Sequence, residues 1–219
     1  MLKCFLVLCI VYLNVDAEKN LEEPRCATIN RNEIEHHLST KTPYRVVANN
    51  DDTVLQYPGC NPTRIWSVIR HGARNPSKKV ILQAQDKLSQ LKEKILRSQK
   101  TTLCSKELET LKWWSFNVSV EEDKFLVAEG EDELIELAER MQNRFPTLLP
   151  STYDSDTYFF KYTATQRTLK SAQSFATGLF GRDRVREVIY PEALHKDPVL
   201  RLKVAEKCCC VLSVNVIQT

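Results

Sequence analysis

A histidine flanked by two arginines is the feature of this sequence with the most specific chemistry. Residues 70–76 read Arg-His-Gly-Ala-Arg-Asn-Pro. Each guanidinium can hold a phosphate group by paired hydrogen bonds, and a neutral imidazole can attack phosphorus. The spacing therefore predicts an anion site in which His71 is the nucleophile and Arg70 and Arg74 bind phosphate. A surface turn with two unrelated arginines is the alternative.

The residues on either side of this motif predict how it is held. Residues 65–69, Ile-Trp-Ser-Val-Ile, have the composition of a short buried strand. At the end of the motif, Asn75 is a favourable helix N-cap and Pro76 suits the first helical position. His71 would then lie at the carboxyl end of a strand and beside a helix N-terminus. Ligands bind at that edge of α/β sheets, and the free N–H groups of a helix N-terminus favour anions.

A second turn of the same kind provides a third arginine. Arg167 follows an expected strand at residues 157–163 and precedes an expected helix. If the two strands are neighbours in a parallel sheet, Arg167 joins Arg70 and Arg74 around one phosphate. Taken alone, Arg167 is equally well explained as a surface cation.

The apolar pattern along the chain predicts the rest of the fold. Stretches with helical spacing of apolar residues are separated by short runs rich in β-branched and aromatic residues. This order predicts an α/β fold with a parallel-sheet core, in which the helices of residues 77–145 form a side lobe. We expect helices at residues 77–97, 105–114, 131–145 and 168–180, and strands at residues 65–69, 157–163 and 185–190.

The first residues predict export. Residues 1–17 have the form of a signal peptide, with an apolar run and an expected cleavage after Ala17; an uncleaved anchor is the alternative. We expect the product in the secretory pathway, either in the endoplasmic reticulum lumen, secreted or at the cell surface, without a membrane span after cleavage. Six of the eight cysteines follow residue 17 and suggest disulfides. Asn117-Val118-Ser119 is an N-glycosylation acceptor.

Composition limits the classes of partner. The chain has 31 Lys and Arg against 28 Asp and Glu, which gives a net charge of +3. This charge is too small and too dispersed to predict binding to nucleic acid. A small phosphorylated anion is the expected partner. The three adjacent cysteines at residues 208–210 lack the spacing of a metal site, so neither a metal nor another cofactor is expected.

The heptapeptide resembles the Arg-His-Gly-x-Arg-x-Pro signature of the histidine acid phosphatases, branch 2 of the histidine phosphatase superfamily. Residues 126–134 and 165–180 resemble the multiple inositol polyphosphate phosphatases within that family. The resemblance extends from about residue 38 to residue 201. It implies a phosphomonoesterase that hydrolyses inositol polyphosphates such as phytate, and 2,3-bisphosphoglycerate. It also implies that His71 forms a phosphohistidine while the three arginines hold the phosphate.

The sequence departs from that family towards its end. Family members are much longer and carry a His-Ala-Glu or His-Asp block, whose acid protonates the leaving alkoxide; no such block occurs here. His195-Lys196-Asp197 is a poor substitute, because it lies in a segment that matches another family stretch. We expect residues 18–201 to form the N-terminal part of the phosphatase domain, incomplete at its C-terminus, and residues 202–219 to form a divergent tail.

The missing acid leaves three hypotheses open. The first is a truncated phosphatase with weak activity or none. The second is a non-catalytic secreted fragment that binds anions through the arginines. The third is a chain that does not fold stably, because an incomplete sheet exposes an edge and apolar surface. Release of phosphate from an inositol polyphosphate separates the first hypothesis from the other two.

Overall fold

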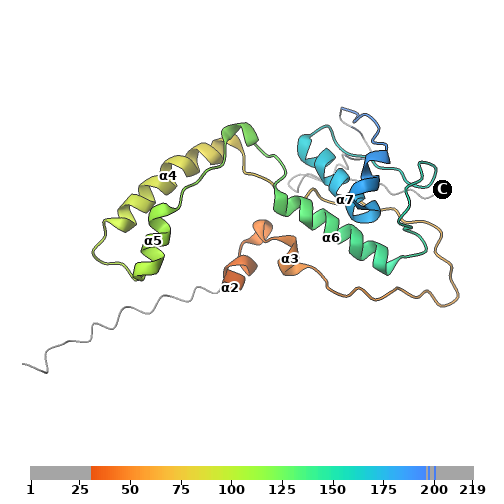
Figure 1. Cartoon of the computed structure of the whole chain (residues 1–219), viewed down its shortest axis with the longest axis horizontal. Helices are drawn as coiled ribbons and strands as arrows, with labels where there is room; N and C mark the ends of the chain where they lie inside the picture. The colour runs from red at the N-terminus through yellow and green to blue at the C-terminus, as the bar shows by residue number, and fades with distance from the viewer. Residues whose placement is uncertain (1–30, 196, 198–199, 201–219) are drawn as a thin grey trace, which may run out of the picture. The chain divides into compact units, whose positions relative to one another are not determined.

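The computed structural model describes residues 31–195, 197 and 200. Helices joined by long irregular segments make up this part of the chain (Figure 1). Among the described residues, two compact units are formed, one that contains residues 86–116 and another that contains residues 31–85 and 117–195. The elements are α2 (Arg31–His36), η1 (Ser39–Lys41), α3 (Tyr44–Val47), α4 (Lys78–Leu96), α5 (Ser105–Trp113), η2 (Val120–Glu122), α6 (Ala128–Arg144), α7 (Gln166–Arg184) and η3 (Val185–Glu187).

The four helices expected from the apolar pattern are present as α4, α5, α6 and α7, with bounds that differ by a few residues. α6 has Glu129 and Glu131 in its first turn and Arg144 in its last turn, a distribution that suits the helix dipole. α7 is interrupted at Gly181, whose φ of 80° and ψ of 163° are not helical. Glycine adopts this backbone conformation without a steric penalty. The helix expected at residues 168–180 thus ends at a break in the helical backbone, although α7 resumes beyond it to Arg184.

The hydrophobic core lies between α6 and α7. The two helices approach closely at Gly178, where an added Cβ would overlap the Ile135 carbonyl oxygen and lie 2.7 Å from the Ala138 Cβ. A residue without a side chain at this position therefore allows the helix backbones to pack directly. The buried members of the core cluster are Leu134, Ala138, Leu149, Tyr158, Phe160, Ala172, Phe175, Ala176, Leu179, Phe180 and Val188.

The expected parallel sheet is absent from the part of the chain that the structure describes. Residues 65–69 and 158–163 have no regular secondary structure, and residues 185–187 form the 3-10 helix η3. An isolated antiparallel bridge joins Arg74 to Leu126. Ile65 and Ile69 nevertheless pack against the core cluster. The apolar pattern thus identified segments that are partly buried, but a strand also needs a neighbouring strand to complete its hydrogen bonds.

The side lobe expected at residues 77–145 is also wrong in its extent. α6 packs against α7 in the core rather than joining a separate lobe. The unit that contains residues 86–116 holds α5 and the C-terminal part of α4.

The two cysteines among the described residues differ in state. Cys104, next to the start of α5, is disulfide-bonded, whereas Cys60 is free and exposed. The expected signal peptide (residues 1–17) and the expected divergent tail (residues 202–219) lie outside the described residues.

Candidate active site

The loop that carries the Arg-His-Gly motif is fixed by the segment that leads into α6. Residues 73–76 and 124–127 run antiparallel to each other. Gln166, the first residue of α7, accepts a hydrogen bond from the Leu126 N–H at 3.0 Å and so ties the second arginine turn to the same segment. The backbone bonds run from Val127 N–H to Ala73 O (3.1 Å), from Asn75 N–H to Phe125 O (2.9 Å) and from Lys124 N–H to Pro76 O (3.1 Å).

These bonds correct the expected start of the helix after the motif. Asn75 and Pro76 are paired with residues 124–125 and precede α4, which begins at Lys78. The Lys78 N–H donates to the Asp123 carboxylate at 2.8 Å. A carboxylate from a distant segment thus caps α4, in place of Asn75.

Two glycines allow the loop to lie directly on the first turn of α6. A Cβ at Gly72 would overlap the backbone of Gly130, and a Cβ at Gly130 would overlap the carbonyl oxygen of Ala73. Glycine is therefore required at both positions for this approach of one backbone to the other.

Two polar side chains hold the amides that follow His71. The Glu133 carboxylate, on α6, accepts the Ala73 N–H at 2.6 Å with one oxygen and the Tyr44 N–H at 2.9 Å with the other. Ser171, fully buried on α7, accepts the Gly72 N–H at 3.2 Å. Both residues lie in segments that carry the family resemblance, but neither was predicted to be a site residue. Only the spacing of Gly130 and Glu133, which places them on one face of a helix, could have suggested a common function.

His71 is held as a neutral imidazole. Its side chain is 6% exposed, and its Nδ1 lies 2.8 Å from the Gly72 carbonyl oxygen. A carbonyl oxygen only accepts hydrogen bonds, so Nδ1 carries the proton and Nε2 keeps its lone pair. Burial lowers the pKa of His71 below its ordinary value of 6.5, and the charges of Arg167, Arg70 and Arg74 lower it further. The imidazole is thus prepared to act as a nucleophile through Nε2.

The three arginines named from the sequence all act on this imidazole. Arg70 is exposed, whereas Arg74 and Arg167 are half-buried. Arg167 lies in the first turn of α7, and Arg74 donates from its guanidinium to the Asn75 carbonyl at 2.8 Å. Because each of the three charges lowers the pKa of His71, the structure gathers them within electrostatic range of one buried ring. Such a cluster of cations suits a phosphate group.

Comparison with known proteins agrees with this arrangement. The sequence profile of the histidine phosphatase superfamily (branch 2) matches residues 64–207, which include the loop and both arginine turns. The chain belongs to this superfamily. Histidine phosphatase domains are α/β folds, so the helical part described here is a portion of that class.

A curated relative gives a closer comparison. The chain is 32% identical over 189 residues to "Multiple inositol polyphosphate phosphatase 1" of Drosophila melanogaster. The match covers 81% of this chain but 39% of the relative. No solved structure matches the chain. The motifs that resemble the inositol polyphosphate phosphatases thus lie in a chain that spans well under half of such a relative.

In this member of the histidine phosphatase superfamily, Asp197 is held in a buried ion pair. The Asp197 side chain is 3% exposed, and its carboxylate lies 2.7 Å from the Lys161 ammonium. The carboxylate is thus buried and bound to a cation of the same chain, away from solvent. The neighbouring His195 is exposed.

The glycosylation acceptor, membrane spans and metal sites are the remaining features considered in the sequence analysis. Asn117 is exposed, as a glycosylation acceptor must be, and the Ser119 hydroxyl accepts the Glu121 N–H at 3.2 Å. None of the helices in the described ranges combines the length and apolar character that a membrane span requires. Among residues 31–195, 197 and 200, no three His, Cys, Asp or Glu side chains form a group that could hold a metal ion.

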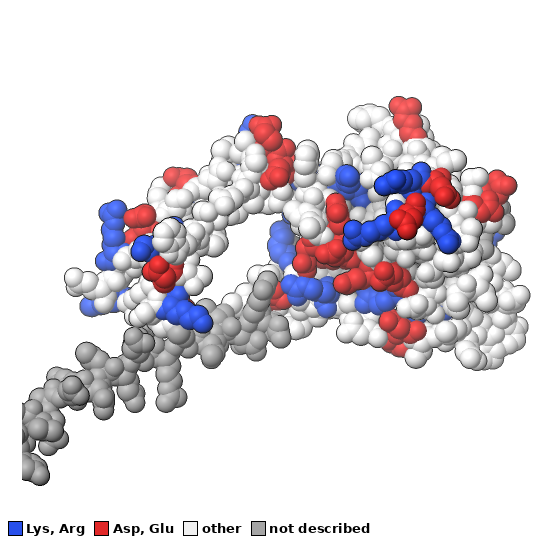
Figure 2. Space-filling model, viewed as in Figure 1, with Lys and Arg blue, Asp and Glu red and all other residues white. Residues whose placement is uncertain are grey.

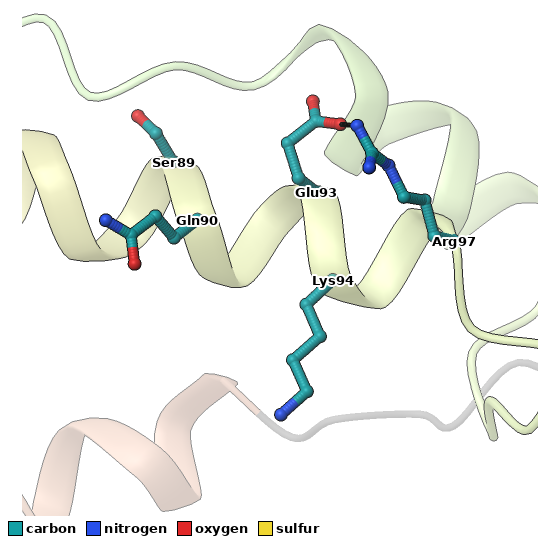
Figure 3. A pocket seen from close by; sticks show the side chains of 5 residues that line it. All are labelled: Ser89, Gln90, Glu93, Lys94 and Arg97. Carbon is teal, nitrogen blue, oxygen red and sulfur yellow. Dashed lines mark hydrogen bonds and ion pairs between the residues drawn. The ribbon is translucent and has the colours of Figure 1, made fainter.

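A hollow on the surface of α4 lies outside the candidate site. Figure 3 shows its lining side chains, Ser89, Gln90, Glu93, Lys94 and Arg97. The Glu93 carboxylate and the Arg97 guanidinium form an ion pair of 3.3 Å one helical turn apart, which is an ordinary feature of an exposed helix. Acidic and basic side chains are interspersed over the face of the molecule seen in Figure 2.

Proposed function

We propose that the chain carries the nucleophile and the phosphate ligands of a phosphomonoesterase that works through a phosphohistidine. The bond from His71 Nδ1 to the Gly72 carbonyl carries this proposal, because it leaves the lone pair of Nε2 available in a ring that burial keeps neutral. Arg70, Arg74 and Arg167 would hold the oxygens of the phosphoryl group. Membership of the histidine phosphatase superfamily supports these roles.

The reaction has two steps. In the first, the Nε2 lone pair forms a bond to phosphorus while the bond from phosphorus to the ester oxygen breaks, and the leaving oxygen takes a proton from water, which leaves hydroxide. In the second, water attacks phosphorus and the N–P bond breaks, so that inorganic phosphate and neutral His71 are released and a proton of the attacking water neutralises the hydroxide. The arginines bear the charge that the three outer phosphoryl oxygens keep throughout.

The substrates we propose are inositol polyphosphates such as phytate, and 2,3-bisphosphoglycerate. Two observations support this class. The curated relative is named for inositol polyphosphates, and three guanidinium groups around one imidazole suit a densely charged anion. The exposed Asn117 and the export features of residues 1–17 support a site of action in the secretory pathway, as lumenal, secreted or surface protein.

The second candidate is a non-catalytic anion-binding fragment. The sequence has no His-Ala-Glu or His-Asp block, and Asp197 is held in an ion pair. Without a proton donor, the chain would bind phosphate but expel an alkoxide very slowly. Both candidate functions use Arg70, Arg74 and Arg167 to bind phosphate. They differ in whether a phosphoryl group is transferred to His71.

The role of Arg167 as a phosphate ligand is tested by a matched pair of arginine variants on α7. Arg167→Ala should lower kcat/KM for p-nitrophenyl phosphate by about 100-fold, because one charged donor is lost from the developing transition state. Arg182→Ala removes an exposed arginine from the other end of the same helix and should leave kcat/KM unchanged. Equal rates for both variants would rule out Arg167 as a phosphate ligand.

A further inference from the structure

One peptide unit of the loop is hydrogen-bonded at both ends. The carbonyl of Gly72 accepts from His71 Nδ1 at 2.8 Å, and the N–H of Ala73 donates to the Glu133 carboxylate at 2.6 Å. These two groups belong to the same amide, which joins residues 72 and 73. The chain of contacts therefore runs from carboxylate to amide to imidazole without a gap.

We propose that Glu133 is a positioning residue for His71, which acts through the peptide between Gly72 and Ala73. This inference rests on the proposed role of His71 as nucleophile. The Glu133 carboxylate fixes the plane of the amide and, through it, the direction in which the Gly72 carbonyl faces the imidazole. This series of two hydrogen bonds, from the Glu133 carboxylate through the amide to the imidazole, is called the relay below. The relay selects the tautomer with the proton on Nδ1 and points Nε2 at the phosphate.

The charge of Glu133 strengthens both bonds of the relay. A carboxylate that accepts an amide N–H increases the negative charge on the carbonyl oxygen of that amide, because hydrogen bonds in series polarise one another. A more negative Gly72 oxygen binds the Nδ1 proton more strongly and makes Nε2 more basic. In metal sites, carboxylates beside a ligating histidine have the same effect on its tautomer and basicity. Here a peptide lies between the carboxylate and the histidine.

Glu133 is itself held in place. Its second oxygen accepts the Tyr44 N–H at 2.9 Å, so the carboxylate joins the start of α3 to the loop. The contact between Gly72 and Gly130 fixes the loop on the same helix that carries Glu133. Arg167, Arg70 and Arg74 are the charged groups that act directly on His71, and all three oppose its protonation. Glu133 supplies the opposite effect through the amide.

The test is Glu133→Gln in the full chain, read by ¹⁵N NMR of the His71 ring in phosphate-free buffer. The glutamine side chain lacks the charge, and its single oxygen can accept only one of the two N–H groups, of Ala73 and Tyr44, that the carboxylate accepts. We expect the Nδ1–H tautomer to lose population to Nε2–H and the pKa of His71 to fall. For p-nitrophenyl phosphate, kcat should fall about 10- to 100-fold, as for other partners of active-site histidines, with KM little changed because the arginines are intact.

Glu129→Gln is the matched control. Glu129 lies one turn earlier on α6 and accepts from the Arg45 guanidinium at 2.7 Å, with no bond to the loop. Both variants remove one negative charge from the same end of the helix. The proposal is overturned if the His71 spectrum of Glu133→Gln equals that of the unaltered chain, or if Glu129→Gln changes it equally. Loss of turnover in His71→Asn alongside an unchanged Glu133→Gln spectrum would reject the relay and retain the proposed function.

A measurement on the unaltered chain covers the case in which Glu133→Gln fails to fold. A scalar coupling across the hydrogen bond should connect the Ala73 amide nitrogen to the Glu133 carboxyl carbon, and the His71 ring should show a protonated Nδ1 at neutral pH. A folded chain with Nε2 protonated instead would contradict the relay, whether or not the chain hydrolyses phosphate esters.

Discussion

At the scale of single residues, the burial of His71 has two consequences for its chemistry. It removes water from the ring, and it places the ring near three arginines. Both effects disfavour the imidazolium, since a charged ring loses hydration and is repelled by the guanidinium groups. A nucleophile must be unprotonated, so the surroundings that we propose to bind phosphate would also favour the reactive form of the imidazole.

This lowered pKa predicts how stability depends on pH. The folded-state pKa of His71 lies below the ordinary value of 6.5, so the unfolded chain binds more protons between those two values. The free energy of unfolding should therefore fall as the pH drops from 6.5 towards the folded-state pKa. His71→Asn lacks this titration. Urea unfolding in phosphate-free buffer should show the stability of the unaltered chain falling relative to His71→Asn over this window; a difference that stays constant with pH would contradict the burial of the ring.

The individual residues differ in how far the sequence predicted them. His71 and the arginines could be named because their types and spacing define a chemistry before any contact is known. The Nδ1 bond to Gly72 and the role of Glu133 could not, because they depend on how the loop lies against α6. Glu133 is one of many carboxylates in the chain, and only the close approach of Gly72 to Gly130 brings it to the Ala73 amide.

At the scale of elements, the helices were predictable and the strands were not. The apolar face of α6 repeats with helical spacing, and α7 is stopped by a glycine, so both signals are local. A parallel strand depends on neighbours that are distant in the sequence. Residues 65–69 and 158–163 contribute side chains to the core but have no ladder partner within the described residues.

The packing of α6 on α7 makes Gly178 a sensitive position. In Gly178→Ala, the new methyl group would overlap the Ile135 carbonyl, so the helices must separate. Overpacking of this kind costs about 1–3 kcal/mol, which outweighs a gain in helix propensity of up to about 1 kcal/mol. We expect a net loss in the free energy of unfolding by urea. Lys170→Ala, at an exposed position on α7, should change it by less than about 0.5 kcal/mol. A Gly178→Ala variant as stable as Lys170→Ala would contradict the close approach of the helices.

At the scale of the whole molecule, the phosphate ligands that we propose are present without the proton donor of the family resemblance. The chain matches 39% of its curated relative and contains the loop, both arginine turns and the helices that fix them, but no His-Ala-Glu or His-Asp block. In the proposed reaction, phosphoryl transfer to His71 needs the loop and the arginines. Departure of an alkoxide from an inositol ring also needs the acid of the His-Ala-Glu or His-Asp block.

This separation predicts a dependence on the leaving group. General acid catalysis contributes about 10²–10⁴-fold, so the chain should hydrolyse phytate at least that much more slowly than a phytate-hydrolysing phosphatase that carries the His-Ala-Glu or His-Asp block. p-Nitrophenolate leaves without protonation, so the rate with p-nitrophenyl phosphate should be reduced far less. Both rates are measured by phosphate release under the same conditions. Hydrolysis of phytate at the rate of such a phosphatase would show that the described site includes an acid that we have not identified.

The most direct test of the account is to trap the phosphoryl group on the enzyme. The chain is mixed with p-nitrophenyl phosphate, quenched in alkali, and examined by ³¹P NMR and by mass spectrometry of its peptides. We predict one phosphoryl group on Nε2 of His71, absent from His71→Asn and reduced in Arg167→Ala. A phosphoryl group on another residue, on Nδ1, or still present in His71→Asn would contradict the proposed nucleophile.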